Sequence, residues 1–261
     1  MTVKGAAYAT VLARLVASFI ALIILVKGSK GIKLHLRDMV PNKKAIQLLL
    51  KIGLPSSIGQ GISALGFTVL QGVVNGFGTA VIAAFGIGNR IIGLFNMPAM
   101  GISQATSVLV GQQLGAKNYN NVKKIVKHSF ITIIIFISIG MTVTFFKGNS
   151  VVKFFVNDPD VIYHGAMLFK IVSPSVIFFA LFTVANGAFQ GAGDTKPIMI
   201  LNIIRLWGLR VPVVFMLVAF TALGPVSIWI GMFTSNLVVA IVGLLILSRG
   251  KWMYTLNSDE I

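Results

Sequence analysis

The feature that most constrains this chain is a series of long runs without a charged residue. No Asp, Glu, Lys or Arg occurs in residues 52–89, 91–116, 129–146, 171–193 or 211–248. About 20 apolar helical residues cross the hydrocarbon core of a bilayer, so these runs are of the right length for transmembrane helices. Only 11% of the 261 residues are charged, against about 25% in soluble domains. We therefore predict an all-α, polytopic membrane protein.

Two of the uncharged intervals are long enough for more than one crossing and need a turn. Residues 75–78 (Asn-Gly-Phe-Gly) and 223–225 (Leu-Gly-Pro) supply these turns, since Gly and Pro interrupt helices. We predict seven spans, at about 5–27, 50–76, 79–113, 125–147, 163–190, 197–220 and 225–248. The third is too long for one straight helix and contains Pro98 and several glycines, so we expect it to be kinked or broken.

The net charge of +16 raises the question of nucleic-acid binding. The cations, however, lie in short connectors between apolar runs, which is the positive-inside pattern of membrane proteins and not a basic recognition face. If the first residue is outside, fourteen cations lie on inner segments and three on outer segments. The inner ones are Lys27, Lys30, Lys33, Arg37, Lys43, Lys44, Lys51, Lys117, Lys123, Lys124, Lys127, Lys196, Arg249 and Lys251, and the outer ones are Lys4, Lys147 and Lys153. We predict a multi-pass protein of the cell membrane with a cytoplasmic carboxyl terminus and no nucleic-acid partner.

The amino-terminal apolar stretch reads as a span and not as a cleaved signal peptide. Arg14 interrupts it, and the strong basic cluster follows it where a signal peptide would be preceded by one. The predicted organisation is a lone transmembrane helix at 1–27, a basic cytoplasmic linker at 28–49, a six-helix transmembrane lobe at 50–251 and a cytoplasmic tail at 252–261.

Nothing in the sequence resembles an enzyme or a metal site. The chain has no cysteine, and its three histidines, His35, His128 and His164, are far apart. No nucleophile–base set or phosphate-binding loop is visible. We predict no catalytic residue, no bound metal and no organic cofactor.

Two connectors on the predicted cytoplasmic side share a turn pattern. The third span ends with Val-Gly-Gln-Gln-Leu-Gly-Ala-Lys-Asn at 110–118, and the fifth with Ala-Phe-Gln-Gly-Ala-Gly-Asp-Thr-Lys-Pro at 188–197. Glycine at a helix end can adopt the left-handed conformation, and Asp or Thr can cap the next helix with Pro in its first turn. We therefore assign structural turn roles to Gly115, Gly191, Gly193, Asp194 and Pro197.

Together these motifs resemble multidrug and toxin extrusion (MATE) transporters. The resemblance rests on Gly-Leu-Pro at 53–55, Gly-Gln-Gln-Leu-Gly-Ala at 111–116, Gln-Gly-Ala-Gly-Asp-Thr-Lys-Pro at 190–197 and the Met-Pro-containing stretch at 97–105. It implies that residues 45–251 form the second six-helix lobe of a two-lobed transporter and that residues 5–27 form the last helix of the first lobe. Each motif is weak alone, but their order and sidedness agree.

The resemblance implies a secondary active exporter of drugs or amphiphilic organic compounds, working by alternating access between two lobes and coupled to sodium ions or protons. The first lobe is mostly absent from this chain, so a missing amino-terminal lobe on another chain is an expected partner, together with membrane lipid and a small-molecule substrate. Two alternatives stay open. One is a lipid or lipid-linked sugar flippase of similar architecture, and the other is an inactive remnant or non-transporting membrane subunit.

The predicted spans contain basic residues and no acid. All six acidic residues fall in predicted loops, turns or the tail, whereas five cations lie within spans: Arg14, Arg90, Lys170, Arg205 and Arg210. Charges inside a membrane are costly and usually functional. Arg205 and Arg210 share one span, and five residues apart on an α-helix they face different directions. We predict that at least one meets a carboxylate of the absent lobe or an anionic substrate.

Amide and guanidinium groups within the spans are the candidates for lining the substrate cleft. Their alternative role is hydrogen bonding between helices. The candidate set is Gln60, Gln71, Asn75, Arg90, Gln104, Asn186, Arg205, Arg210 and Asn236.

Overall fold

The computed structural model describes residues 2–28 and 42–254, which form helices and turns without a β-strand. Seven helical segments are long and apolar enough to cross a membrane. They are α1 (Thr2–Lys27), α2 (Lys43–Asn75), α3 (Thr79–Gly115), α4 (Tyr119–Lys153), α5 (Pro159–Gly191), a composite segment of α6 (Thr195–Ile203), η2 (Ile204–Arg210) and α7 (Val211–Phe220), and α8 (Val226–Ser248). The predicted all-α, seven-span transmembrane bundle is confirmed.

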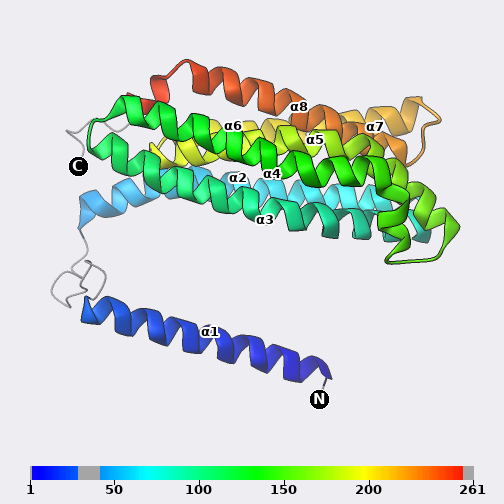
Figure 1. The fold of residues 1–261 in the computed structure, drawn as a ribbon, viewed down its shortest axis with the longest axis horizontal. Helices are drawn as coiled ribbons and strands as arrows, with labels where there is room; N and C mark the ends of the chain where they lie inside the picture. The colour runs from blue at the N-terminus through cyan, green and yellow to red at the C-terminus, as the bar shows by residue number, and fades with distance from the viewer. Residues whose placement is uncertain (1, 29–41, 255–261) are drawn as a thin grey trace. The chain divides into compact units, whose positions relative to one another are not determined.

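The chain divides into two units, Met1–Leu49 and Leu50–Ile261. The first contains α1, whose residues Tyr8–Lys27 form the apolar segment. The second contains most of α2 and everything that follows (Figure 1). Residues 29–41, the main part of the predicted basic linker, and residues 255–261 of the predicted tail lie outside the described residues.

Helix α5 is the centre of the second unit. It packs against α3, α4 and α8, and half of its apolar window is buried, the largest share of the seven segments described (Figure 1). Its contact with α3 depends on two small residues, Gly187 and Gly191. A Cβ atom at either position would lie 2.3 Å from a backbone carbonyl oxygen of α3, that of Ser103 or Ser107 respectively. Small residues at such positions let membrane helices approach closely.

Several predicted span ends differ from the observed helices. Helix α2 begins at Lys43, within the segment assigned to the linker. Helix α4 extends from Tyr119 to Lys153, and Asn118 caps it by accepting a hydrogen bond from the Asn121 amide. Its φ/ψ angles leave the helical region at Lys147, where the predicted span ended. These helices extend past the apolar window because caps and solvated basic residues support further turns.

We expected the third span to be kinked or broken, and the break is not found. Helix α3 runs continuously from Thr79 to Gly115 with Pro98 inside it. At the other end of the chain, the predicted tail begins with structured residues. Trp252 and Met253 are buried in η3 (Lys251–Tyr254), a 3-10 helix that packs onto the bundle.

The two similar connectors form the same hydrogen-bonded turn. In each, a residue with positive φ follows the helix, Lys117 (φ 57) after α3 and Gly193 (φ 72) after α5. Each turn has two backbone hydrogen bonds of 2.8–3.1 Å. After α3, the amides of Lys117 and Asn118 donate to the carbonyls of Leu114 and Gln113, and after α5, those of Gly193 and Asp194 donate to Gln190 and Phe189. This is the Schellman pattern.

Within these turns, the expectation for Gly115 is wrong. Gly115 is the last residue of α3, and the left-handed position two residues later belongs to Lys117. Gly193 occupies the left-handed position as predicted, whereas Gly191 provides the close contact with α3. Asp194 is the N-cap residue of α6 without a side-chain capping bond, and Pro197 lies in the first turn of that helix.

Candidate functional site

The strongest candidate site is a small cavity within the second unit that contains two buried arginines. Its volume is about 160 Å³. Its walls come from α2, α3, α5, η2 and α8, and they combine aromatic, aliphatic and amide side chains with the two guanidinium groups. The lining residues are Phe67, Asn89, Ile92, Asn96, Val172, Val176, Phe179, Arg205, Arg210, Met232 and Asn236.

Arg210 is held tightly by α8. Its side chain is 2% exposed. Its Nε donates to Ser235 Oγ at 2.8 Å, and one terminal nitrogen donates to Asn236 Oδ1 at 2.7 Å. The Asn236 amide in turn donates to Ser175 Oγ on α5 at 3.3 Å. This chain of bonds fixes the guanidinium against two helices.

Arg205 is also buried, but its hydrogen bonding is much weaker than that of Arg210. It is 5% exposed, and a terminal nitrogen lies 3.5 Å from Asn202 Oδ1, at the limit for a hydrogen bond. Its guanidinium lies 4.9 Å from the centre of the Phe179 ring, a cation–π distance. Its Nε has no hydrogen-bond partner. Arg205 therefore keeps an unused donor within the cavity wall.

The two cations have only neutral hydrogen-bond partners among the described residues. The described acids, Asp158, Asp160 and Asp194, lie at or next to helix N-termini and do not line the cavity. Another polar atom of the lining, Asn96 Oδ1, is buried without a partner. Two unneutralised cations in a low-dielectric interior are unfavourable, and an anion placed between them would relieve this cost.

A π-helix brings the two arginines to the same cavity. On an α-helix five residues turn through about 500°, which would place Arg205 and Arg210 about 140° apart. Residues Ile204–Arg210 form a π-helix instead, and its i→i+5 pattern aligns residues five apart. The expectation that the two side chains face different directions is wrong for this reason. Pro212 contributes, because it has no amide hydrogen to give to the preceding turn.

The structure brings together three members of the predicted site, Arg205, Arg210 and Asn236. On α2, the Gln71 amide donates to Asn75 Oδ1 at 3.1 Å, and both residues are exposed. Three other candidates, Gln60, Arg90 and Gln104, are exposed on α2 and α3 and do not line this cavity. Asn186 on α5 is partly buried, and its Oδ1 lacks a partner.

Sequence reasoning missed Asn89 and Asn96 on α3 and the two serines that hold Arg210 and Asn236. For the asparagines a signal was present. They are seven residues apart, two turns of an α-helix, so they share one face of the predicted span. Ser175 and Ser235 gave no such signal, because serine is common at helix–helix contacts in membranes.

Comparison with known proteins assigns the chain to a family. A family model described as MatE matches residues 55–216. The chain belongs to the MatE family. This match includes both turn motifs and the π-helix that carries Arg205 and Arg210. It confirms the resemblance read from the sequence motifs and places the chain among membrane transporters.

Curated relatives of this MatE chain have names that refer to multidrug resistance. It is 31% identical over 255 residues to the probable multidrug resistance protein NorM of Thermotoga maritima, covering 97% of this chain and 54% of that protein. It is 24% identical over 264 residues to the multidrug export protein MepA of Staphylococcus aureus, covering 100% of this chain and 57% of that protein. The chain therefore spans about half the length of these relatives.

Solved structures of transporters likewise match this chain over about half of their own length. A MATE crystal structure in complex with MaL6 matches with a TM-score of 0.87 and 25% identity over 95% of this chain and 56% of that one. A MOP superfamily transporter from Pyrococcus furiosus, for which a reverse polarity of the binding pocket is described, matches with a TM-score of 0.87 and 26% identity. That match covers 96% of this chain and 56% of the other.

Proposed function

We propose that this MatE chain is one half of a secondary active exporter that moves amphiphilic organic compounds out of the cell. The proposal is supported by the family match and by relatives named for multidrug resistance and export. The chain spans about half the length of those relatives. The proposed transporter therefore also needs a first lobe, on the same or another chain. In transporters built from two repeats, substrate binds near the midplane at the repeat interface, and one repeat rocks against the other.

The exposed polar face of α2 is where we place the first lobe. Gln60 and Gln71 are eleven residues apart, close to three helical turns, so they share a face with the neighbouring Asn75. All three side chains are exposed in this unit. Amide groups are costly against lipid and are satisfied by protein or water. A first lobe opposite α2 would supply protein and water as hydrogen-bond partners for these amides. The polar face of α2 would then form one wall of the substrate cleft.

Coupling to an ion requires a carboxylate inside the membrane, and the described acids of this half occur only at or next to helix N-termini. Proton or sodium coupling normally uses an acid exposed to the transport pathway. Asp158 and Asp194 are N-cap residues, and Asp160 lies in the first turn of α5, so none is deep within a helix. We propose that the coupling carboxylate belongs to the first lobe, with sodium ions or protons as the coupling ion, and that it approaches the arginine cavity during the transport cycle.

The single observation that carries the substrate chemistry is the pair of buried arginines without a described counter-ion. It favours a ligand with an anionic group, either a carboxylate of the first lobe or an acidic amphiphilic substrate. It also favours the second candidate function, a flippase for an anionic lipid or lipid-linked sugar, because a phosphate is a strong partner for guanidinium groups.

The test is transport in proteoliposomes by this chain together with a first lobe supplied on a second chain. Flux of a cationic amphiphilic dye, an anionic amphiphilic dye and a fluorescent anionic phospholipid would be measured under a sodium gradient and, separately, a pH gradient. We expect gradient-driven flux of the anionic dye, reduced at least tenfold by Arg205→Ala with Arg210→Ala, because Arg205 can supply charge-assisted hydrogen bonds worth about 1.5–3 kcal/mol and Arg210 adds positive potential.

The outcomes separate the hypotheses. Phospholipid movement without dye flux would favour the flippase. Equal flux by the double variant would contradict the role of the arginines but not the transporter assignment. No gradient-driven flux of any probe, with both lobes folded, would contradict the exporter proposal and favour a non-transporting subunit.

A further inference from the structure

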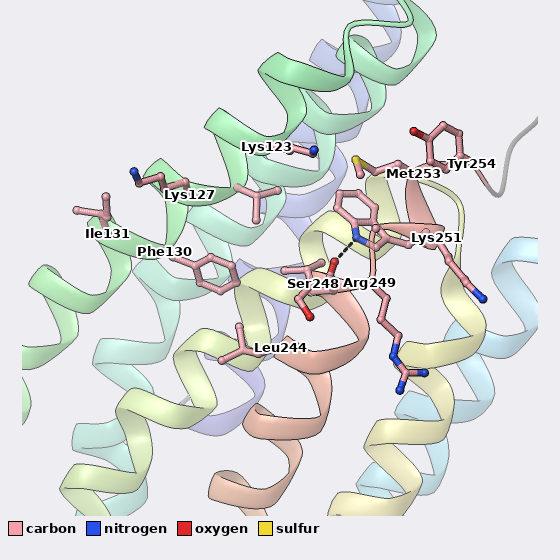
Figure 2. Close-up of a pocket in the computed structure, with 14 residues that line it drawn as sticks. Lys123, Lys127, Phe130, Ile131, Leu244, Ser248, Arg249, Lys251, Met253 and Tyr254 are labelled. Atoms are coloured by element: carbon pink, nitrogen blue, oxygen red, sulfur yellow. Dashed lines mark hydrogen bonds between the residues drawn. The ribbon is translucent and has the colours of Figure 1, made fainter.

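A second, larger pocket lies at the end of the bundle where α4 begins and α8 ends. Its volume is about 800 Å³. Its lining includes four cations from two elements, Lys123 and Lys127 from α4, and Arg249 and Lys251 from the α8–η3 connection, and Figure 2 shows the latter two extending away from α4. No carboxylate among the described residues lines it. It shares no lining residue with the arginine cavity.

The walls of this pocket change from cationic to apolar in the same direction on both sides. On α4, Lys123 and Lys127 are followed one turn further into the bundle by Phe130 and Ile131. Helical spacing of three, four and seven residues puts these on one face. On α8 the order is mirrored, with Leu244 and Leu247 preceding Arg249 at the helix end. A membrane lipid has this same arrangement, a polar headgroup joined to an apolar chain.

The pocket is held in shape by η3. Gly250, with φ of +68°, turns the chain back from the end of α8, a conformation that glycine adopts without steric cost. Trp252 Nε1 then donates to the Leu247 carbonyl at 2.8 Å (Figure 2). The Trp252 ring contacts Phe189 of α5 edge to face, with ring centres 6.1 Å apart. The cationic wall is therefore anchored to the bundle core.

We infer that this pocket binds one anionic phospholipid, with its phosphate at the cationic end of the pocket, beside Lys123 and Lys127 of α4, and an acyl chain along Phe130, Ile131 and Leu244. Charge complementarity selects this occupant. Basic pockets between transmembrane helices on the cytoplasmic side bind anionic headgroups, and Trp and Tyr are enriched at that depth. The lysine distribution that predicts a cytoplasmic carboxyl terminus places the site in the inner leaflet. The site does not depend on the exporter proposal.

The test uses Trp252 as a local reporter. The full chain carrying Trp207→Phe keeps two tryptophans, the fully buried Trp229 and Trp252 in the pocket wall. Quenching would be measured in vesicles of phosphatidylcholine containing brominated phosphatidylglycerol or brominated phosphatidylcholine. We expect stronger quenching by the anionic lipid, with an affinity that Lys123→Gln with Lys127→Gln lowers by about fivefold for each removed cation.

A matched control removes the same charge from the same end of the bundle. Lys117 precedes α4 and Lys124 lies in its first two turns, and neither lines the pocket, so Lys117→Gln with Lys124→Gln should leave the lipid selectivity unchanged. Equal losses in both double variants would show diffuse surface attraction and overturn the inference. Equal quenching by the two lipids would overturn it as well. Selective quenching that appears only after deletion of residues 255–261 would assign the pocket to the chain's own acidic tail, and so contradict a lipid site.

Discussion

Replacing Arg205 by Met is expected to stabilise the isolated chain. A charged side chain at the centre of a membrane helix costs about 2.5–3.5 kcal/mol. In return, Arg205 makes one hydrogen bond at the limiting distance of 3.5 Å and a cation–π contact at 4.9 Å, together worth roughly 1–2 kcal/mol. Methionine fills similar space without charge and removes the unpartnered Nε. The difference predicts a gain of about 1–2 kcal/mol in the free energy of unfolding.

The same replacement at Arg210 is expected to have the opposite sign or no effect. Its two charge-assisted bonds, at 2.8 and 2.7 Å, are worth about 1.5–3 kcal/mol each. Their sum equals or exceeds the cost of burying the charge. The loss would also leave the Asn236 carbonyl oxygen without its donor. The same substitution should therefore raise stability at Arg205 and lower it, or leave it unchanged, at Arg210.

Thermal unfolding of the purified chain in an uncharged detergent measures this difference. Each kcal/mol corresponds to about 2–4 °C in Tm for a chain of this size. We expect Arg205→Met to melt above the unmodified chain and Arg210→Met to melt at or below it. Arg90→Met, at an exposed position of α3, is the control for removing a cation from a span. If Arg205→Met lowered Tm as much as Arg210→Met, a counter-charge would have to neutralise Arg205, and the reasoning from its weak contacts would be refuted.

Two further predictions concern topology and packing. Because the chain has no cysteine, the single variants Lys123→Cys and Asn157→Cys each carry one labelling site. A membrane-impermeant maleimide should modify Asn157→Cys in intact cells, but Lys123→Cys only after permeabilisation. The reverse result would show the opposite topology. Gly187→Ala should destabilise the chain by about 1–3 kcal/mol, since its Cβ would lie 2.3 Å from the Ser103 carbonyl oxygen. Gly86→Ala, which meets nothing within 4 Å, should leave Tm unchanged or raise it, and equal losses in these two variants would argue against the close α3–α5 contact.

The number and type of helices could be predicted from the sequence because lipid imposes a simple rule. A backbone in hydrocarbon must satisfy its own hydrogen bonds, so long uncharged runs become helices. The ends were less predictable. Hydropathy marks where the apolar window stops, whereas helices such as α4 continue past it into solvated, capped turns. Pro98 and nearby glycines predicted a kink or a break in α3. No break is present, because neighbouring helices can support a proline within a transmembrane helix.

The candidate site was predictable in its composition and not in its geometry. Arg205 and Arg210 stand out in sequence as cations in an apolar span. Their common direction depends on a π-helix, and this conformation is supported by bonds from Arg210 to Ser235 and Asn236, which follow it in sequence by 25 and 26 residues. Local propensity carries no information about partners so far along the chain. A regular α-helix was therefore the natural expectation, and it gave the wrong relative direction.

The unequal support of the two arginines suggests a division of roles. Arg210 has its donors committed to α8, so its main effect is to fix the π-helix and to add positive potential to the cavity. Arg205 has an unused Nε and its contacts are weak, so it can turn toward a ligand at little cost. An incoming carboxylate or phosphate would accept from Arg205 while Arg210 remains in place. On this argument, Arg205→Lys should weaken anion binding by losing the planar, two-donor contact, whereas Arg210→Lys should chiefly lower stability; a binding loss confined to Arg210→Lys would reverse the assignment.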